Sequence, residues 1–236
     1  MFLHEQNLPD SLPEEGFVIL IDKPLGFTSF QVVAGVRKAL STRFQSKIKI
    51  GHAGTLDPLA SGLLILCTGK MTKQIQQYQG ADKIYEGSFV LGASRPSYDM
   101  ETEIDQNFSI SELKTEALFR TRDSFMGLQM ISPPVHSAIK IDGKRAYHYA
   151  RKDQISDLPP RPMHIHDFDI DCNTFPEIRF RIHCTKGTYI RSIAHEFGKR
   201  LENGAYLSSL VRTQIGNFKL TNAWTYNQLI DRLRQS

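Results

Sequence analysis

The chain has 236 residues, of which 40% are apolar and 23% are charged, and its formal net charge is +4. These values are ordinary for a soluble globular protein with one large domain or two small ones. No apolar run approaches bilayer-spanning length, and residues 1–15 lack the basic-then-apolar pattern of a signal peptide. We therefore expect a cytoplasmic protein without a membrane partner, whose mild positive charge permits a polyanionic one.

The cysteines and histidines do not form a recognisable framework. Cys67, Cys172 and Cys184 are widely spaced and odd in number, and no Cys-x-x-Cys pair occurs, so neither a disulfide scaffold nor a zinc ribbon is indicated. Three histidines could suggest a metal site, but no cysteine or carboxylate pattern completes one. They are His164, His166 and His183. We predict no metal.

The first predicted elements are a strand at 17–21 and a helix beginning near residue 29. Thr28 or Ser29 can cap this helix. Its apolar positions approximate a helical stripe: Phe30, Val33, Val36 and Leu40.

The next stretch, residues 51–62, is a loop with three glycines and a single carboxylate, Asp57. It precedes the unbroken apolar run 63–67, which reads as a buried strand. Glycines permit backbone conformations that other residues resist, and Pro58 biases Asp57 towards an extended backbone. An Asp-Pro pair between two runs is usually a turn, and spacing alone favours that interpretation. A lone acid on a constrained loop at the mouth of a buried strand is also well placed to meet a substrate.

Further strands are predicted at 83–92 and at 178–184, where apolar and polar residues alternate. In the first, Tyr85 shares a face with other apolar residues, and packing is the usual role of such a tyrosine. Capping boxes predict helix starts at Ser109-x-x-Glu112 and at Thr225-x-x-Gln228.

Residues 186–191 lead into a helix that Thr188 can cap, with Arg191 in its first turn and off the apolar face. A cation there is opposed by the helix dipole, by a few tenths of a kcal/mol or so. The position indicates either a specific anionic partner for Arg191 or an ordinary surface arginine.

Four stretches resemble motifs of the TruB family of tRNA pseudouridine synthases, in the family's order. In chain order they are Asp22-Lys-Pro-Leu-Gly-Phe-Thr-Ser29, Gly51-His-Ala-Gly-Thr-Leu-Asp-Pro-Leu-Ala-Ser-Gly62, Pro133-Pro-Val-His-Ser-Ala-Ile-Lys-Ile-Asp-Gly143 and Cys184-Thr-Lys-Gly-Thr-Tyr-Ile-Arg191. Asp99 matches the aspartate at the end of a loop motif of the family, whereas Arg95 and Pro96 differ from that motif. Phe30 and Gln31 also depart from the family, and we assign them no role.

The resemblance implies a role for each matched residue. Asp57 would be catalytic, and Arg191 would pair with it. Tyr85 would stack on the target uracil and is a candidate to help remove the C5 proton. The implied substrate-binding residues are His52, Tyr189, Leu210, Lys23 and Lys140. His52 would fill space in the RNA loop, Tyr189 would be the second aromatic residue of the uracil pocket, and Leu210 would form its apolar wall. Lys23 belongs to the motif that packs beneath the catalytic loop, and Lys140 would contact a phosphate.

The resemblance also implies an α+β pseudouridine synthase fold, with a mixed, mainly antiparallel sheet and flanking helices. We expect an N-terminal extension at 1–15 and a catalytic domain at 16–236, without the PUA domain of many relatives. The expected activity is isomerisation of uridine 55 in the tRNA T-loop, by a monomer without cofactors.

Three alternatives remain open. The chain could modify another RNA or act through a guide-RNA complex, as dyskerin-type relatives do. It could instead be a non-catalytic RNA chaperone, against which Asp57, Tyr85 and Arg191 argue. A metal-dependent nuclease is the third, and no acidic cluster supports it.

Overall fold

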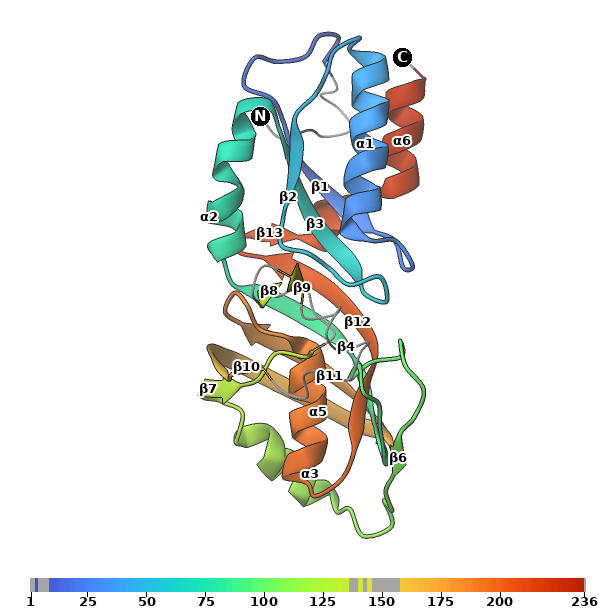
Figure 1. Ribbon diagram of the computed structural model, residues 1–236, viewed down its shortest axis with the longest axis vertical. Coiled ribbons are helices and arrows are strands. Elements are labelled where there is room, and N and C mark those ends of the chain that lie inside the picture. Colours follow the sequence, from blue (N-terminus) through green and yellow to red (C-terminus); the bar gives the residue numbers. More distant parts are fainter. Residues whose placement is uncertain (1–2, 4–8, 136–139, 142–143, 146–157, 236) are drawn as a thin grey trace. The chain divides into compact units, whose positions relative to one another are not determined.

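The computed structural model describes residues 3, 9–135, 140–141, 144–145 and 158–235. The chain divides into two compact units (Figure 1). Unit 1 comprises residues 1–85 and 211–236, and unit 2 comprises residues 86–210. Two strands, β4 (Lys83–Leu91) and β12 (Ala205–Ile215), begin in one unit and end in the other.

The sheet of unit 1 has the strand order β14-β1-β3-β12, with β2 paired to β3 and β13 to β12. Its other strands are β1 (Val18–Lys23), β2 (Ile50–Ala53), β3 (Ser61–Thr68), β13 (Phe218–Lys219) and β14 (Trp224–Thr225). The central pair β1–β3 is antiparallel from Val18↔Cys67 to Lys23↔Gly62, whereas β14 on β1 and β12 on β3 are parallel.

Both faces of the β1–β3 pair are covered. Ile19 and Ile21 on one face pack against α1 and α6, which lie side by side, while Val18 and Leu20 on the other pack with Tyr78 of α2 (Figure 1). The helical segments of this unit are α1 (Ser29–Arg43), η2 (Gly69–Gln74), α2 (Ile75–Gly80), η3 (Leu220–Asn222) and α6 (Tyr226–Arg234). A strand buried on both faces needs apolar residues at successive positions, which explains the unbroken run at 63–67 and confirms the buried strand predicted there.

In unit 2 the main strands have the order β12-β4-β11-β10-β7. Its remaining elements are β5 (Ala93–Ser94), β6 (Gln106–Asn107), α3 (Thr115–Asp123), β7 (Gly127–Ile131), β8 (Lys140–Ile141), β9 (Lys144–Arg145), β10 (Arg161–Thr174), β11 (Glu177–Cys184) and α5 (Ile190–Arg200). A group of packed aromatic rings from β4, β10, β11, α5 and the turn after α3 forms much of its core: Phe89, Phe125, Phe168, Phe180 and Phe197.

The predicted fold class is confirmed, because the sheet is mixed and mainly antiparallel with helices beside it. The strands predicted at 83–92 and 178–184 are present as β4 and β11. In the described residues, every helix is shorter or more polar than a bilayer crossing requires.

Of the four predicted helix caps, those at Thr28 and Thr225 are present and those at Ser109 and Thr188 are not. Thr28 and Thr225 each close a capping box, with Gln31 and Gln228 as the reciprocal partners. Gln31, to which the sequence assigned no role, therefore fixes the start of α1.

The box predicted at Ser109 is wrong, because α3 begins at Thr115. The Ser109 carbonyl accepts a hydrogen bond from Asn203 Nδ2 at 2.8 Å, and the preceding Phe108 N–H donates to the Gly92 carbonyl at 2.8 Å. These tertiary hydrogen bonds hold the segment away from a helical path.

Replacing Thr225 with alanine should lower the free energy of unfolding by about 0.5–2 kcal/mol, because the exposed N–H groups of α6 lose their side-chain acceptor. Urea denaturation would measure this loss. The control is Thr221→Ala, an exposed threonine of η3, for which a change within about 0.5 kcal/mol is expected. Equal effects of the two substitutions would contradict the capping role.

Candidate functional site

The predicted site residues are divided between the two units. Unit 1 carries Lys23, His52, Asp57 and Tyr85, and unit 2 carries Lys140, Tyr189, Arg191 and Leu210. Lys140 lies in β8, but its side chain is outside the described residues.

The loop that carries Asp57 joins the end of β2 to the start of β3, and two of its glycines are required by its geometry. Gly54 and Gly62 have φ angles of +84° and +102°. A Cβ atom on Gly62 would come within 2.5 Å of the Arg212 carbonyl oxygen on β12. Any larger residue at position 62 would therefore push the end of the loop away from the sheet.

Hydrogen bonds tie this loop to the first residue of α1 and to the segment that precedes it. Ser29 Oγ donates to the Leu56 carbonyl at 3.1 Å and accepts from the Leu56 N–H at 2.9 Å. The Gly26 N–H donates to the Pro58 carbonyl at 2.8 Å. Leu56 and Pro58 flank Asp57, so the half-exposed carboxylate stands between two anchored neighbours. This segment contains the Asp22–Ser29 motif, and its hydrogen bonds agree with the predicted packing against the loop.

Lys23 is fully buried at the end of β1. Its Nζ donates to the Phe27 carbonyl at 2.6 Å and to the Pro24 carbonyl at 3.0 Å. Burial lowers the pKa of Lys23 to about 8; the charge of Asp57 opposes this shift and the charge of Arg212 adds to it. Lys23 therefore lies within electrostatic range of Asp57 while it holds the motif turn together.

Arg212 is a buried cation that the sequence analysis did not identify as a site residue. Its side chain is almost fully buried, with Nε donating to the Leu63 carbonyl at 2.8 Å and an NH2 group donating to the Gly54 carbonyl at 3.0 Å. These two carbonyls lie near opposite ends of the Asp57 loop, so one side chain ties both ends together. The available signal was an arginine directly after the apolar pair Leu210-Val211 in a strand.

His52 lies at the entrance to the loop, on β2, and is half-buried. Burial lowers the pKa of His52, and the positive charge of Arg212 lowers it further. The imidazole is thus neutral at pH 7, a form that can stack on a nucleobase. Tyr85 is buried on β4 with 8% of its surface exposed.

In unit 2, Arg191 is buried and fixed by groups of the 94–105 loop. Its Nε lies 3.5 Å from Asp99 Oδ2, in an ion pair whose side chains are 5% and 7% exposed, and an NH1 group donates to the Ser97 carbonyl at 3.3 Å. The prediction of an anionic partner for Arg191 is met within this unit by Asp99. The sequence had matched Asp99 to the family without assigning this contact.

The loop that supplies Asp99 is itself braced. Ser97 and Thr102 exchange hydrogen bonds across the turn, and Asp99 Oδ1 accepts from the Glu101 N–H at 3.0 Å. Tyr98 adopts a left-handed conformation with φ of +64°, and its ring stacks on His195 of α5 with centroids 3.9 Å apart. A non-glycine residue in this region costs energy that the surrounding contacts offset. The Asp99 carboxylate is therefore held in one position against α5.

Tyr189 and Leu210 also occupy defined positions in unit 2. Tyr189 is the N-cap residue of α5 and is half-exposed, and Leu210 on β12 is 9% exposed. The prediction that Thr188 caps this helix is wrong, because Thr188 Oγ1 instead donates to the Thr185 carbonyl at 2.9 Å. That bond shapes the turn and places Tyr189, rather than Thr188, at the helix start.

The stability contribution of Lys23 should depend on pH. Between its native pKa of about 8 and its usual value of 10.5, the unfolded chain binds more protons at this lysine than the native protein does. Stability from this group therefore rises with pH in that window, by roughly 3 kcal/mol at most. Urea denaturation at pH 7, 8, 9 and 10 should show wild type gaining stability relative to Lys23→Met above pH 8. A pH-independent difference would contradict the shifted pKa.

Residues 37–190 match the family described as TruB family pseudouridylate synthase (N terminal domain). The tRNA pseudouridine synthase B of Flavobacterium johnsoniae is 48% identical over 211 residues, which cover 89% of this chain and 92% of that protein. The protein of the same name from Bacteroides fragilis is 46% identical over 209 residues, which cover 88% of this chain and 89% of that protein.

Among solved structures, the chain is similar to one in a Cbf5-Nop10-Gar1 complex, with a TM-score of 0.69 and 29% identity. The similarity covers 91% of this chain and 53% of that one, so the present chain spans about half the length of that protein. Because the family match covers more than half of the chain and relatives at 46–48% identity cover nearly all of it, the chain belongs to the TruB family of pseudouridylate synthases.

Proposed function

We propose that this protein is a tRNA pseudouridine synthase that isomerises uridine 55 in the T-loop. The observation that carries the proposal is its identity of 46–48%, over nearly the whole chain, to proteins named tRNA pseudouridine synthase B. The anchored loop around Asp57 supplies the chemical group that such a reaction needs.

The isomerisation breaks the N1–C1′ bond of uridine and forms a C5–C1′ bond, while N1 gains a proton and C5 loses one. No atom is gained and no redox change occurs. The reaction needs a carboxylate beside the ribose, a pocket that retains the detached uracil, and exclusion of water. Asp57 either attacks C1′, as glycosidase carboxylates do, or removes a ribose proton to give a glycal.

The contacts within unit 1 support a catalytic role for Asp57. Its neighbour Leu56 is hydrogen-bonded to Ser29 at the start of α1, its neighbour Pro58 to Gly26 before the helix, and Arg212 ties both ends of the loop. Because a displaced catalytic group can lose about 100-fold in rate, this anchoring is what a nucleophile or base requires. The Lys23 cation lies within electrostatic range of Asp57.

The other roles follow the family resemblance. Arg191 would orient the Asp57 carboxylate through charge-assisted hydrogen bonds. Tyr85 and Tyr189 would sandwich the uracil, and Leu210 would line its pocket. The burial of Arg191 against Asp99 and Ser97 supports a fixed guanidinium.

The target base lies inside a folded RNA loop, so it must be flipped out, at a cost of a few kcal/mol. The neutral imidazole of His52 would stack in the space that the base leaves, and Lys140 would contact phosphate. The proposed enzyme is a cytoplasmic monomer, with its catalytic domain at 16–236 after an extension at 1–15. Its chemistry requires neither a metal nor an organic cofactor.

The proposal is tested by mapping pseudouridine in an unmodified tRNA transcript after incubation with the protein alone. We expect one new pseudouridine, at position 55, detected as a carbodiimide-dependent stop in reverse transcription. A transcript with cytidine at position 55 is the control and should stay unmodified. Pseudouridine elsewhere would contradict the proposed target, and activity only with an added guide RNA would favour the dyskerin-like alternative.

Replacing Asp99 with asparagine should lower kcat by about 10–100-fold, because Arg191 loses the charge that fixes it. The matched control is Asp105→Asn, which removes an exposed carboxylate of the same loop and should leave kcat within about twofold. Kinetics at saturating tRNA, on variants shown by circular dichroism to be folded, would measure both. Lower thermal stability with unchanged kcat would make the Arg191–Asp99 pair structural only.

A further inference from the structure

A groove in unit 1 is lined by side chains of α1 and of the segment that enters β2. It has a volume of about 760 Å³ and is lined by Ala34, Arg37, Lys38, Ser41, Lys47, Ile48, Lys49 and Ile50. Every charged residue of this lining is a cation. We call it the basic groove.

The four cations of the basic groove are exposed, and among the described residues no carboxylate forms an ion pair with any of them. Elsewhere in the described chain exposed cations do find carboxylates, as Lys70 does with Glu14 and Glu15. Four like charges around one groove repel one another, so an anion supplied from outside would be attracted to it.

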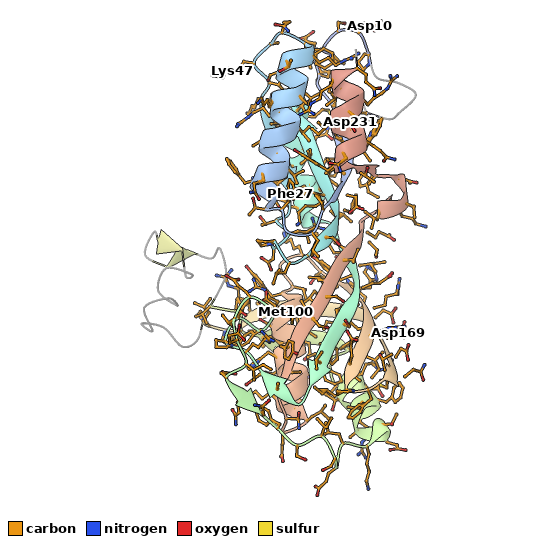
Figure 2. All side chains as sticks on the ribbon, turned by 90° about the vertical axis from the view of Figure 1, so that its right-hand side faces the viewer. Asp10, Phe27, Lys47, Met100, Asp169 and Asp231 are labelled. Atoms are coloured by element: carbon orange, nitrogen blue, oxygen red, sulfur yellow. The ribbon has the colours of Figure 1, made fainter. Side chains whose placement is uncertain are left out.

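Two elements, α1 and β2, connect the groove to the neighbourhood of the Asp57 loop. Arg37 follows Ser29 by eight residues of α1, about 12 Å along the helix. Lys49 precedes His52 by three residues, about 10 Å along the strand. Lys47 follows α1 and lies near its C-terminal end, whereas Phe27 lies near its N-terminal end (Figure 2). A double helix carries a phosphate charge every 1.7 Å or so, so several phosphates fall within this distance of a target nucleotide.

We propose that the basic groove binds the sugar-phosphate backbone of the tRNA beside the flipped uridine. This inference rests on the proposed function and adds to it a place where RNA is held outside the catalytic loop. Arg37 can grip a phosphate with two parallel hydrogen bonds, and the lysines act as point charges. Such contacts position the RNA without reading its sequence.

The test compares two variants that each lose four positive charges. The groove variant carries Arg37→Gln, Lys38→Gln, Lys47→Gln and Lys49→Gln. The control variant carries Lys114→Gln, Arg120→Gln, Lys199→Gln and Lys219→Gln, all at exposed positions outside the groove and the candidate site. Both have a formal net charge of 4 − 4 = 0, so non-specific attraction falls equally.

Binding of an unmodified tRNA transcript is measured as Kd from 50 to 300 mM salt. At 0.1 M salt we expect the Kd of the groove variant to be at least tenfold higher than that of the control variant. The slope of log Kd against log salt concentration should fall by about 2–4, because each lost phosphate contact lowers the slope by about 1. Its kcat at saturating tRNA should stay within twofold of wild type, with the loss confined to KM.

Equal Kd values and equal salt slopes in the two variants would overturn the proposal. So would unchanged tRNA binding with a selective loss of binding to anionic lipid vesicles, which would assign the groove to a membrane surface. Failure of the wild type to form pseudouridine would refute the proposed reaction, whereas the salt slopes with tRNA test the groove independently of catalysis.

Discussion

The candidate site of unit 1 depends on two buried cations, Lys23 and Arg212, which hold the backbone around the loop that carries Asp57. Lys23 and Arg212 are withdrawn from water and directed at backbone carbonyls, of residues 24 and 27 for the lysine and of residues 54 and 63 for the arginine. Burying a charge is costly unless the charged group is hydrogen-bonded, and these carbonyl groups supply the hydrogen bonds. Lys23 lies within electrostatic range of Asp57, and Arg212 ties both ends of the loop that carries this carboxylate.

Unit 2 also contains a buried, hydrogen-bonded cation, and here the cation belongs to an ion pair. Arg191 is buried against Asp99, and a loop containing the left-handed Tyr98 holds that carboxylate in place. Removing one member of a buried pair generally costs more than the pair contributes, because the other charge is left without compensation. Both units therefore hold a cation rigidly, and rigidity is what electrostatic assistance to a reaction requires.

The sequence predicted those features that local rules govern. Apolar continuity located β3, alternation located β11, and the capping box at Thr225 located α6, because each pattern reflects a periodic contact or a cap within a few residues. The box at Ser109 failed because hydrogen bonds to Gly92 and Asn203, distant in sequence, override the local preference. Arg212 and the Asp99–Arg191 pair were missed for the same reason, since their partners lie 92 or more residues away.

The most direct test of the account is release of tritium from C5-tritiated uridine in a T-arm hairpin, for wild type and Asp57→Asn. The substitution preserves shape and removes the carboxylate. The account predicts tritium release by wild type and none by the variant, with hairpin binding within about threefold of wild type. Release by both proteins would show that the reaction is right and that Asp57 does not catalyse it, which would contradict the central claim.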